Sequence, residues 1–422
     1  MTNVYNFWES QLIPNVVKFY KNPYLTAIRH SFYTLMPFWL TISALDILEN
    51  LILNPNGLVM SSNGLNLGFW LTGGLSDEEY LNSGFVKTLS TYRHIVGLAY
   101  GIITVIITAT LAGKLSDIFN SDKILTIFCA LSAFILMSPP VDIEVSDYFS
   151  NQGFFSAFFT TFASSILFAY LSRQKRLQLK TPKSLPNELS KYIKKTLPIL
   201  LTLLSFSIFS FIITTIRLNG SSFVEYLSTL TIFQNPLFAL FYQFIVWLLW
   251  WLGIPGYGVT SEIIDIAYNP AQISNQIGDT SAIFTTGFFA AGVIHVMGLM
   301  IAILVFSQHE RWRSVSKFSL PVMMFNVQEI FIFGLPVILN PIFLVPYILA
   351  PLADTLVGYV AISWGIVPVF QVDIPWTMPL FLSAAAGTHS FMGGILQIVW
   401  LIMDIFIYAP FVITANAVEL KD

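Results

Sequence analysis

The 422-residue chain is 55% hydrophobic and only 10% charged, with a mean hydropathy of +0.72. A soluble domain carries roughly 25% charged residues, so this composition excludes water as the main solvent of the folded chain. The formal net charge of −3 argues against a nucleic-acid-binding surface, which needs a clustered basic face. The sequence therefore predicts an all-α polytopic membrane protein.

The apolar stretches predict about ten membrane-spanning helices. Residues 1–23 contain no continuous apolar segment of the kind found in signal peptides, so no cleavable signal is expected. Stretches of about 20 apolar residues are long enough to cross the bilayer as helices. In chain order, we expect spans at 32–53, 95–113, 124–139, 155–171, 196–216, 236–254, 291–307, 319–340, 341–363 and 391–415.

Basic residues orient the first half of the chain. Residues 172–195 hold eight of the 20 Lys and Arg, whereas 140–153 hold none, and Lys114 and Lys123 flank the loop two spans earlier. The positive-inside rule then places the N-terminus and 172–195 in the cytoplasm and 140–153 outside. Basic clusters also bind anionic lipids. Because basic and non-basic loops alternate from one predicted span to the next, we favour membrane topology as the explanation of this charge pattern.

Two regions of the second half do not read as straight helices. Residues 255–290 and 364–390 are moderately apolar but repeatedly interrupted by Pro and Gly. Irregular backbone at membrane depth survives only where protein or a water-filled cavity satisfies it. Transporter substrate sites are built from such interrupted segments. The pattern indicates a protein that binds or moves a solute.

Several acidic residues lie inside the predicted spans. Glu329 has the most apolar surroundings, and an intramembrane acid usually faces a cavity or a partner. The alternative for Glu329 is a structural acid paired with a backbone or basic group. For Asp46, Glu49 and Asp404, a structural or interfacial role is favoured.

Tryptophans gather where the sixth predicted span ends. Trp247, Trp250 and Trp251 lie in VWLLWWLGIPG, and Trp376 lies in DIPWTMP. Aromatic faces stack on the apolar faces of sugar rings. Trp is also the ordinary residue of the membrane interface, and composition alone favours that belt for these residues.

The chain carries no recognisable catalytic or metal motif. Its five His and its single Cys129 show no metal-ligand spacing, and there is no nucleotide loop or nucleophile elbow. His295 and His389, in or near the interrupted regions, are expected to be hydrogen-bonded core residues. We therefore expect no catalytic residue, no metal and no cofactor.

The stretch FNVQEIFIFGLPVILNP at 325–341 resembles the lactose/cellobiose/diacetylchitobiose branch of the enzyme IIC sugar permeases of the bacterial phosphotransferase system. That family carries F-N-I-N-E-P followed by F-G-L-P and L-N-P at this place. YLTAIRHSFYTLMP at 24–37 is similar to the family's opening segment, and LAPLADTLVGYVA, IPWTMP and LQIVWLIMDIFIYAPF match its C-terminal pattern. The resemblance runs from about residue 20 to 415.

The resemblance implies a multi-pass protein of the bacterial cytoplasmic membrane with ten transmembrane helices and two re-entrant hairpins. It implies an N-terminal region at 1–235 that forms a homodimer and a C-terminal region at 236–422 that binds substrate. Family members carry a disaccharide across the membrane and present its 6-hydroxyl to a phosphocysteine on a separate enzyme IIB. The implied partners are therefore enzymes IIB and IIA, a second copy of the chain and the lipid bilayer.

The resemblance also assigns substrate-binding residues. Glu329 matches the family's sugar-binding glutamate, and Asn326 and Gln328 stand at the two asparagine positions of the same motif. Trp376 matches the tryptophan that stacks on a sugar ring. Trp250 matches an aromatic residue just before the family's G-I-H-G motif.

One departure from the family concerns phosphorylation. The family's G-I-H-G reads G-I-P-G here, so Pro255 stands where a histidine contacts sugar near the phosphoryl acceptor. His295, on the altered hairpin sequence AGVIHVMGL, could replace that imidazole. We expect slow or absent phosphorylation-coupled uptake with sugar binding at least partly retained. The alternative function is a permease-like membrane receptor or regulator that binds sugar or a partner without phosphorylation-coupled transport.

Overall fold

The chain folds into helices arranged in two compact bodies. A larger body has its described residues within 40–96 and 231–417, and a smaller body has them within 22–39 and 97–219. All regular elements of the described residues are helices, which confirms the all-α prediction for them. The computed structural model describes residues 22–55, 59–60, 65–100, 102–138, 149, 153–219, 231–279, 281–335, 337–372, 374 and 377–417.

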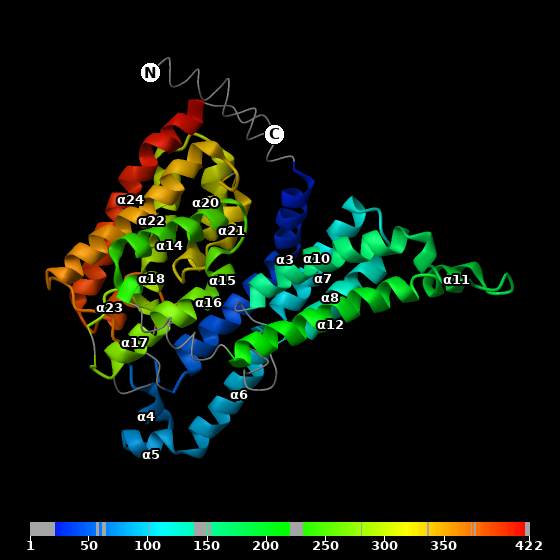
Figure 1. Cartoon of the computed structure of the whole chain (residues 1–422). Coiled ribbons are helices and arrows are strands. Elements are labelled where there is room, and N and C mark those ends of the chain that lie inside the picture. The colour runs from blue at the N-terminus through cyan, green and yellow to red at the C-terminus, as the bar shows by residue number, and fades with distance from the viewer. Residues whose placement is uncertain are drawn as a thin grey trace. The chain divides into compact units, whose positions relative to one another are not determined.

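The smaller body is a bundle of long helices (Figure 1). The side chain of Asp122 caps the start of the helix at Lys123–Leu136 by accepting a hydrogen bond from the Leu125 N–H at 3.2 Å. Asp122 also forms an ion pair with Lys191 at 2.9 Å, which ties a short basic helix to the bundle. The helices are α7 (Ile103–Ile118), α8 (Lys123–Leu136), α10 (Phe154–Arg173), α11 (Asn187–Ile193) and α12 (Thr196–Asn219), joined by the start of α3 (Pro23–Ile47).

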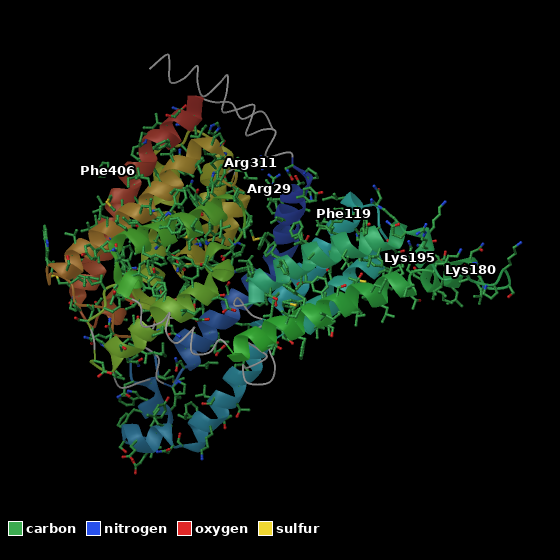
Figure 2. All side chains as sticks on the ribbon, in the orientation of Figure 1. Arg29, Phe119, Lys180, Lys195, Arg311 and Phe406 are labelled. Carbon is green, nitrogen blue, oxygen red and sulfur yellow. The ribbon has the colours of Figure 1, made fainter. Side chains whose placement is uncertain are left out.

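The basic segment predicted at 172–195 lies at one end of this bundle. Figure 2 shows Lys180 and Lys195 there, beside α11. The Lys195 ammonium donates to the Ser172 carbonyl at 2.7 Å, so the segment folds back on the end of α10. Most of the acidic segment 140–153 lies outside the described residues, and the predicted sidedness of both segments stays a prediction.

In the larger body, four apolar helices lie against one another. Helix α19 (His295–Phe306) packs along α24 (Phe391–Ala417), and α22 (Pro341–Ser363) packs against α24 and α14 (Pro236–Trp251) (Figure 1). The start of α22 is fixed by Asn340, whose side chain accepts from the Ile342 N–H at 3.0 Å, with proline in the first turn. The remaining α-helices before the interrupted regions are α4 (Leu67–Leu71), α5 (Asp77–Leu81) and α6 (Gly84–Tyr100).

Both interrupted regions are broken into short helices, as predicted. The side chain of Gln397 on α24 supports them by donating to the Ala291 carbonyl at 2.9 Å and accepting from the Ala384 N–H at 3.2 Å. These two bonds pair backbone groups at the ends of short helices, where the helices themselves leave such groups without partners. The re-entrant geometry stays a prediction. The short helices are α15 (Gly256–Val259), α16 (Ser261–Ile263), α17 (Asn269–Gln276), α18 (Thr286–Ala291) and α23 (Leu382–Gly387).

The described residues contain five helices long and apolar enough to cross a membrane, and the count of ten stays a prediction. One expected span is wrong: 319–340 is not a single helix. Helix α20 (Glu310–Met323) ends early, Asn326 adopts a left-handed φ of 64°, and a new helix α21 (Glu329–Gly334) begins. Apolar composition cannot reveal this reversal. The five candidates are Phe154–Arg173, Asn187–Thr215, Thr286–Phe306, Pro341–Ser363 and Phe391–Asn416.

Candidate functional site

The break between α20 and α21 carries two buried polar side chains. Gln328 and Glu329 are each 5% exposed, and each leaves one oxygen, Oε1 and Oε2 respectively, without a hydrogen-bond partner. The carboxylate of Glu329 faces the backbone N–H groups of Gln328 and Glu329 itself. A buried acceptor without a donor is costly. These two oxygens are therefore positioned to accept hydrogen bonds from a ligand.

The segment after α21 is joined to the end of α14. The Leu339 N–H donates to the Trp251 carbonyl, and the Trp251 indole donates to the Asn340 carbonyl, both at 2.9 Å. Leu339 reaches this position with a left-handed φ of 58°. The turn at Leu339 and the helix cap at Asn340 thus hold the Glu329 segment against the tryptophan cluster.

The tryptophan cluster lies in the interior of the larger body. Trp247, Trp250 and Trp251 are 0%, 4% and 7% exposed, so the interfacial belt favoured by composition is wrong for all three. The rings of Trp247 and Trp250 stack with centroids 6.4 Å apart. The Trp250 indole N–H has no hydrogen-bond partner, which leaves a donor at the position that the resemblance assigns to substrate.

Pro255 lies in a tight reversal after this cluster. Gly253 has a left-handed φ of 81°, and its N–H donates to the Trp250 carbonyl at 2.9 Å. A Cβ on Gly256 would lie 2.1 Å from the Val246 carbonyl oxygen, so the turn presses against the backbone of α14. Pro255 is buried there and supplies no polar side-chain atom.

His295 opens α19 and lies against the same cluster. Its ring is perpendicular to Trp247 with centroids 4.0 Å apart, and its Nδ1 is 2.9 Å from the Tyr408 hydroxyl. Its Nε2 is buried and has no partner. The Tyr347 ring lies 5.5 Å from His295, and the Tyr347 hydroxyl interacts electrostatically with Glu329.

The remaining predicted residues lie beside the helix break. Asn326 forms the reversal itself, and its N–H donates to the Met323 carbonyl at 2.9 Å. Trp376 lies outside the described residues. Nearby, the Leu380 N–H donates to the Met324 carbonyl at 3.1 Å, so the chain soon after Trp376 runs next to the Asn326 turn.

Sequence reasoning missed several polar residues of this interior. Tyr347 and Tyr408 gave no signal, because a tyrosine in a predicted span is usual. Asp354 gave a clear signal that was not used, an acid within an apolar span. Asp404 is 0% exposed, which agrees with a structural role, the first of the two roles expected for it, and not with an interfacial one. Among the described residues, no group of three or more His, Cys, Asp or Glu could hold a metal ion.

Comparison with known proteins places this arrangement in a family. Residues 76–351 match the family model described as "Phosphotransferase system, EIIC". The chain is 27% identical to the oligo-beta-mannoside-specific EIIC component of Bacillus subtilis (strain 168), over 95% of this chain and 91% of that protein. It is 25% identical to the lactose-specific EIICB component of Staphylococcus haemolyticus (strain JCSC1435), over 96% of this chain and 69% of that protein.

A solved structure shares the fold. The crystal structure of the transporter ChbC, the IIC component of an N,N'-diacetylchitobiose-specific phosphotransferase system, aligns with a TM-score of 0.53 and 23% identity, covering 97% of this chain and 98% of that one. The matched family region includes the Asn326 turn, Gln328 and Glu329. The chain belongs to the EIIC family of the phosphotransferase system.

Proposed function

We propose that the chain carries a disaccharide across the membrane and that Glu329 accepts hydrogen bonds from its hydroxyls. By family membership, the chain is a sugar permease component of the phosphotransferase system. The observation that carries the site assignment is the pair of buried, unpartnered oxygens on Gln328 and Glu329 at the helix break. Sugar hydroxyls are the donors that such oxygens lack.

A disaccharide is favoured by the relatives and by the side chains around the site. Similar proteins are named for oligo-beta-mannoside, cellobiose and lactose. We infer that Trp250 and Trp376 contact the sugar, Trp250 through its unpartnered indole N–H and Trp376 by stacking. Asn326 and Gln328 supply further polar contacts, while Pro255 and His295 line the end of the site nearest the phosphoryl acceptor.

The similar proteins also suggest which partner proteins the chain has. Relatives named EIICB are longer than this chain and support an enzyme IIB partner, which holds the phosphoryl donor. We propose that enzyme IIA acts with it and that 1–235 mediates a homodimer, while 236–422 binds substrate.

We propose a cytoplasmic N-terminus, with 172–195 cytoplasmic and 140–153 external. Single cysteines placed in these two segments of a Cys129→Ser protein are expected to react with impermeant thiol reagents from opposite sides of the membrane. Labelling of both from one side contradicts this topology.

The transport proposal is tested by counterflow. Purified protein is reconstituted into vesicles preloaded with unlabelled cellobiose, lactose or mannobiose, and uptake of the labelled sugar is measured without any partner protein. We expect saturable uptake of at least one sugar that is lost in Glu329→Ala. Binding without uptake, for every sugar of the panel, favours the receptor alternative suggested by Pro255.

A further inference from the structure

One end of the smaller body carries half of the chain's basic residues. Residues 114–123, which join α7 to α8, and the basic segment 172–195, which joins α10 to α12, together hold ten of the 20 Lys and Arg. The same residues hold only three of the 23 Asp and Glu. Because the whole chain has a formal net charge of −3, this end is strongly positive in a molecule that is otherwise acidic.

Three cations of the basic segment attach it to the helix bundle. The Arg173 guanidinium donates to the Phe119 carbonyl in the turn between α7 and α8. Lys191 pairs with Asp122, directly before α8, at 2.9 Å, and the Lys195 ammonium donates to a carbonyl at the end of α10 at 2.7 Å. The segment is therefore attached near both of its ends, which gives it a defined shape over the end of the bundle.

The cations between these attachments are exposed, and Figure 2 shows one of them, Lys180, at this end of the bundle. None of them forms an ion pair within the part of the chain that the structure describes. Several cations close together on one surface attract anions. The exposed cations are Lys175, Arg176, Lys180 and Lys183.

The neighbouring spans place these cations at the level of lipid head groups. The candidate span α10 ends at Arg173, and the candidate span Asn187–Thr215 begins inside the basic segment. Only 17% of the most apolar stretch of Asn187–Thr215 is buried within the chain, so most of this stretch contacts the surroundings of the chain. Basic residues beside the end of a span lie at the membrane surface, where the lipid phosphates are.

Apolar side chains among the cations favour a membrane surface over an acidic protein. Leu179 and Leu189 are 42% and 47% exposed, and each has basic residues on both sides in the sequence. At a membrane surface, basic side chains bind phosphate while neighbouring apolar side chains enter the interfacial layer. A binding surface for an acidic protein does not need to lie at the ends of two spans.

We propose that the exposed cations of the basic segment bind the phosphate groups of anionic phospholipids and hold this end of the smaller body at the membrane surface. The predicted topology depends only on how many basic residues each loop contains. Lipid binding depends on the folded segment, which leaves four of its cations unpaired. The proposal is independent of the sugar site.

Enrichment of anionic lipid beside the basic segment tests the proposal. A donor dye is attached to Ser184→Cys, at an exposed position of the segment, in the full chain carrying Cys129→Ser. The protein is placed in phosphatidylcholine nanodiscs, and energy transfer to acceptor-labelled phosphatidylglycerol is compared with transfer to acceptor-labelled phosphatidylcholine. One basic residue near a charged lipid changes its local concentration about fivefold. We therefore expect phosphatidylglycerol to be enriched around the dye at least about fivefold at low salt.

Neutralising the exposed cations should remove most of this enrichment. The test variant is Arg176→Gln/Lys180→Gln/Lys183→Gln. Its control removes the same residue types at exposed positions of the larger body and should leave the enrichment unchanged: Arg313→Gln/Lys87→Gln/Lys317→Gln. Raising the salt concentration to about 1 M shortens the screening length to about 3 Å, so the enrichment should also fall in the protein without these substitutions.

Equal transfer from the two labelled lipids, at low salt and without the charge substitutions, would overturn the proposal. An enrichment that persists in the test variant or at high salt also overturns it, and the salt series decides the question if the variant does not fold. Loss of the enrichment in potassium phosphate, but not in chloride of equal ionic strength, would instead assign these cations to free phosphate. Binding of enzyme IIB that the test variant loses, without any lipid enrichment, would assign them to an acidic protein.

Discussion

Removing the Glu329 side chain should weaken sugar binding strongly while leaving the fold intact. The carboxylate is 5% exposed and its Oε2 has no protein partner, so truncation breaks no hydrogen bond of that oxygen within the free protein. A hydrogen bond to a charged group contributes about 1.5–3 kcal/mol. Because about 1.4 kcal/mol corresponds to a tenfold change in Kd, Glu329→Ala should weaken binding on the order of 10- to 100-fold.

The isosteric variant separates charge from shape. Glu329→Gln keeps an acceptor oxygen but exchanges a charge-assisted hydrogen bond for a neutral one, worth about 0.5–1.5 kcal/mol. The difference of roughly 1 kcal/mol predicts about a fivefold loss of affinity. Glu329→Gln should therefore bind more tightly than Glu329→Ala and more weakly than the native chain.

Isothermal titration calorimetry of the purified protein against cellobiose, lactose and mannobiose measures these affinities. Glu310→Gln is a matched control, because Glu310 is an exposed glutamate that also begins a helix of the larger body. Its affinity should equal that of the native chain. An unchanged Kd in Glu329→Ala, for a sugar that the native chain binds, refutes the reasoning and places the site elsewhere.

Two further predictions concern the turn after α14. Gly256→Ala should lower the apparent melting temperature, because its Cβ would lie 2.1 Å from a backbone oxygen and overpacking of this kind costs roughly 1–3 kcal/mol. The control Gly84→Ala, whose Cβ would have nothing within 4 Å, should leave the melting temperature unchanged. Equal melting temperatures of the two variants contradict the observed packing. Misplacement of a reacting group by about 1 Å can lower the reaction rate on the order of 100-fold. Uptake driven by phosphorylated enzyme IIB should therefore be slow in the native chain. It should be faster in Pro255→His and slower still in His295→Ala. Fast IIB-driven uptake by the native chain that survives His295→Ala contradicts this reading of the proline.

Local signals predicted parts of the fold well. The span expected at 341–363 coincides with α22, because Asn340 and Pro341 form a cap that is readable in the sequence. The interrupted regions were predictable for a similar reason, since Pro and Gly mark breaks directly. The turn at Asn326 was not predictable from apolarity, because a left-handed asparagine inside an apolar stretch leaves the hydropathy unchanged.

The sequence supplied candidate residues for the proposed site, but not the contacts among them. Glu329 stood out as an acid in an apolar stretch. The burial of Tyr347 in the same interior depends on how the helices pack, and the sequence does not show it. Trp247 was misjudged, because hydropathy does not distinguish a tryptophan of the protein interior from one of the membrane interface. Pairings such as His295 with Tyr408, separated by more than a hundred positions, require the tertiary structure.

The most direct test of the sugar site is an experimental structure of the chain with a disaccharide bound. The predicted result is density for the sugar with a hydroxyl within hydrogen-bonding distance of the Glu329 carboxylate and a ring against Trp376. Density for the disaccharide elsewhere in the chain, with the Glu329 Oε2 still lacking a partner, would contradict it.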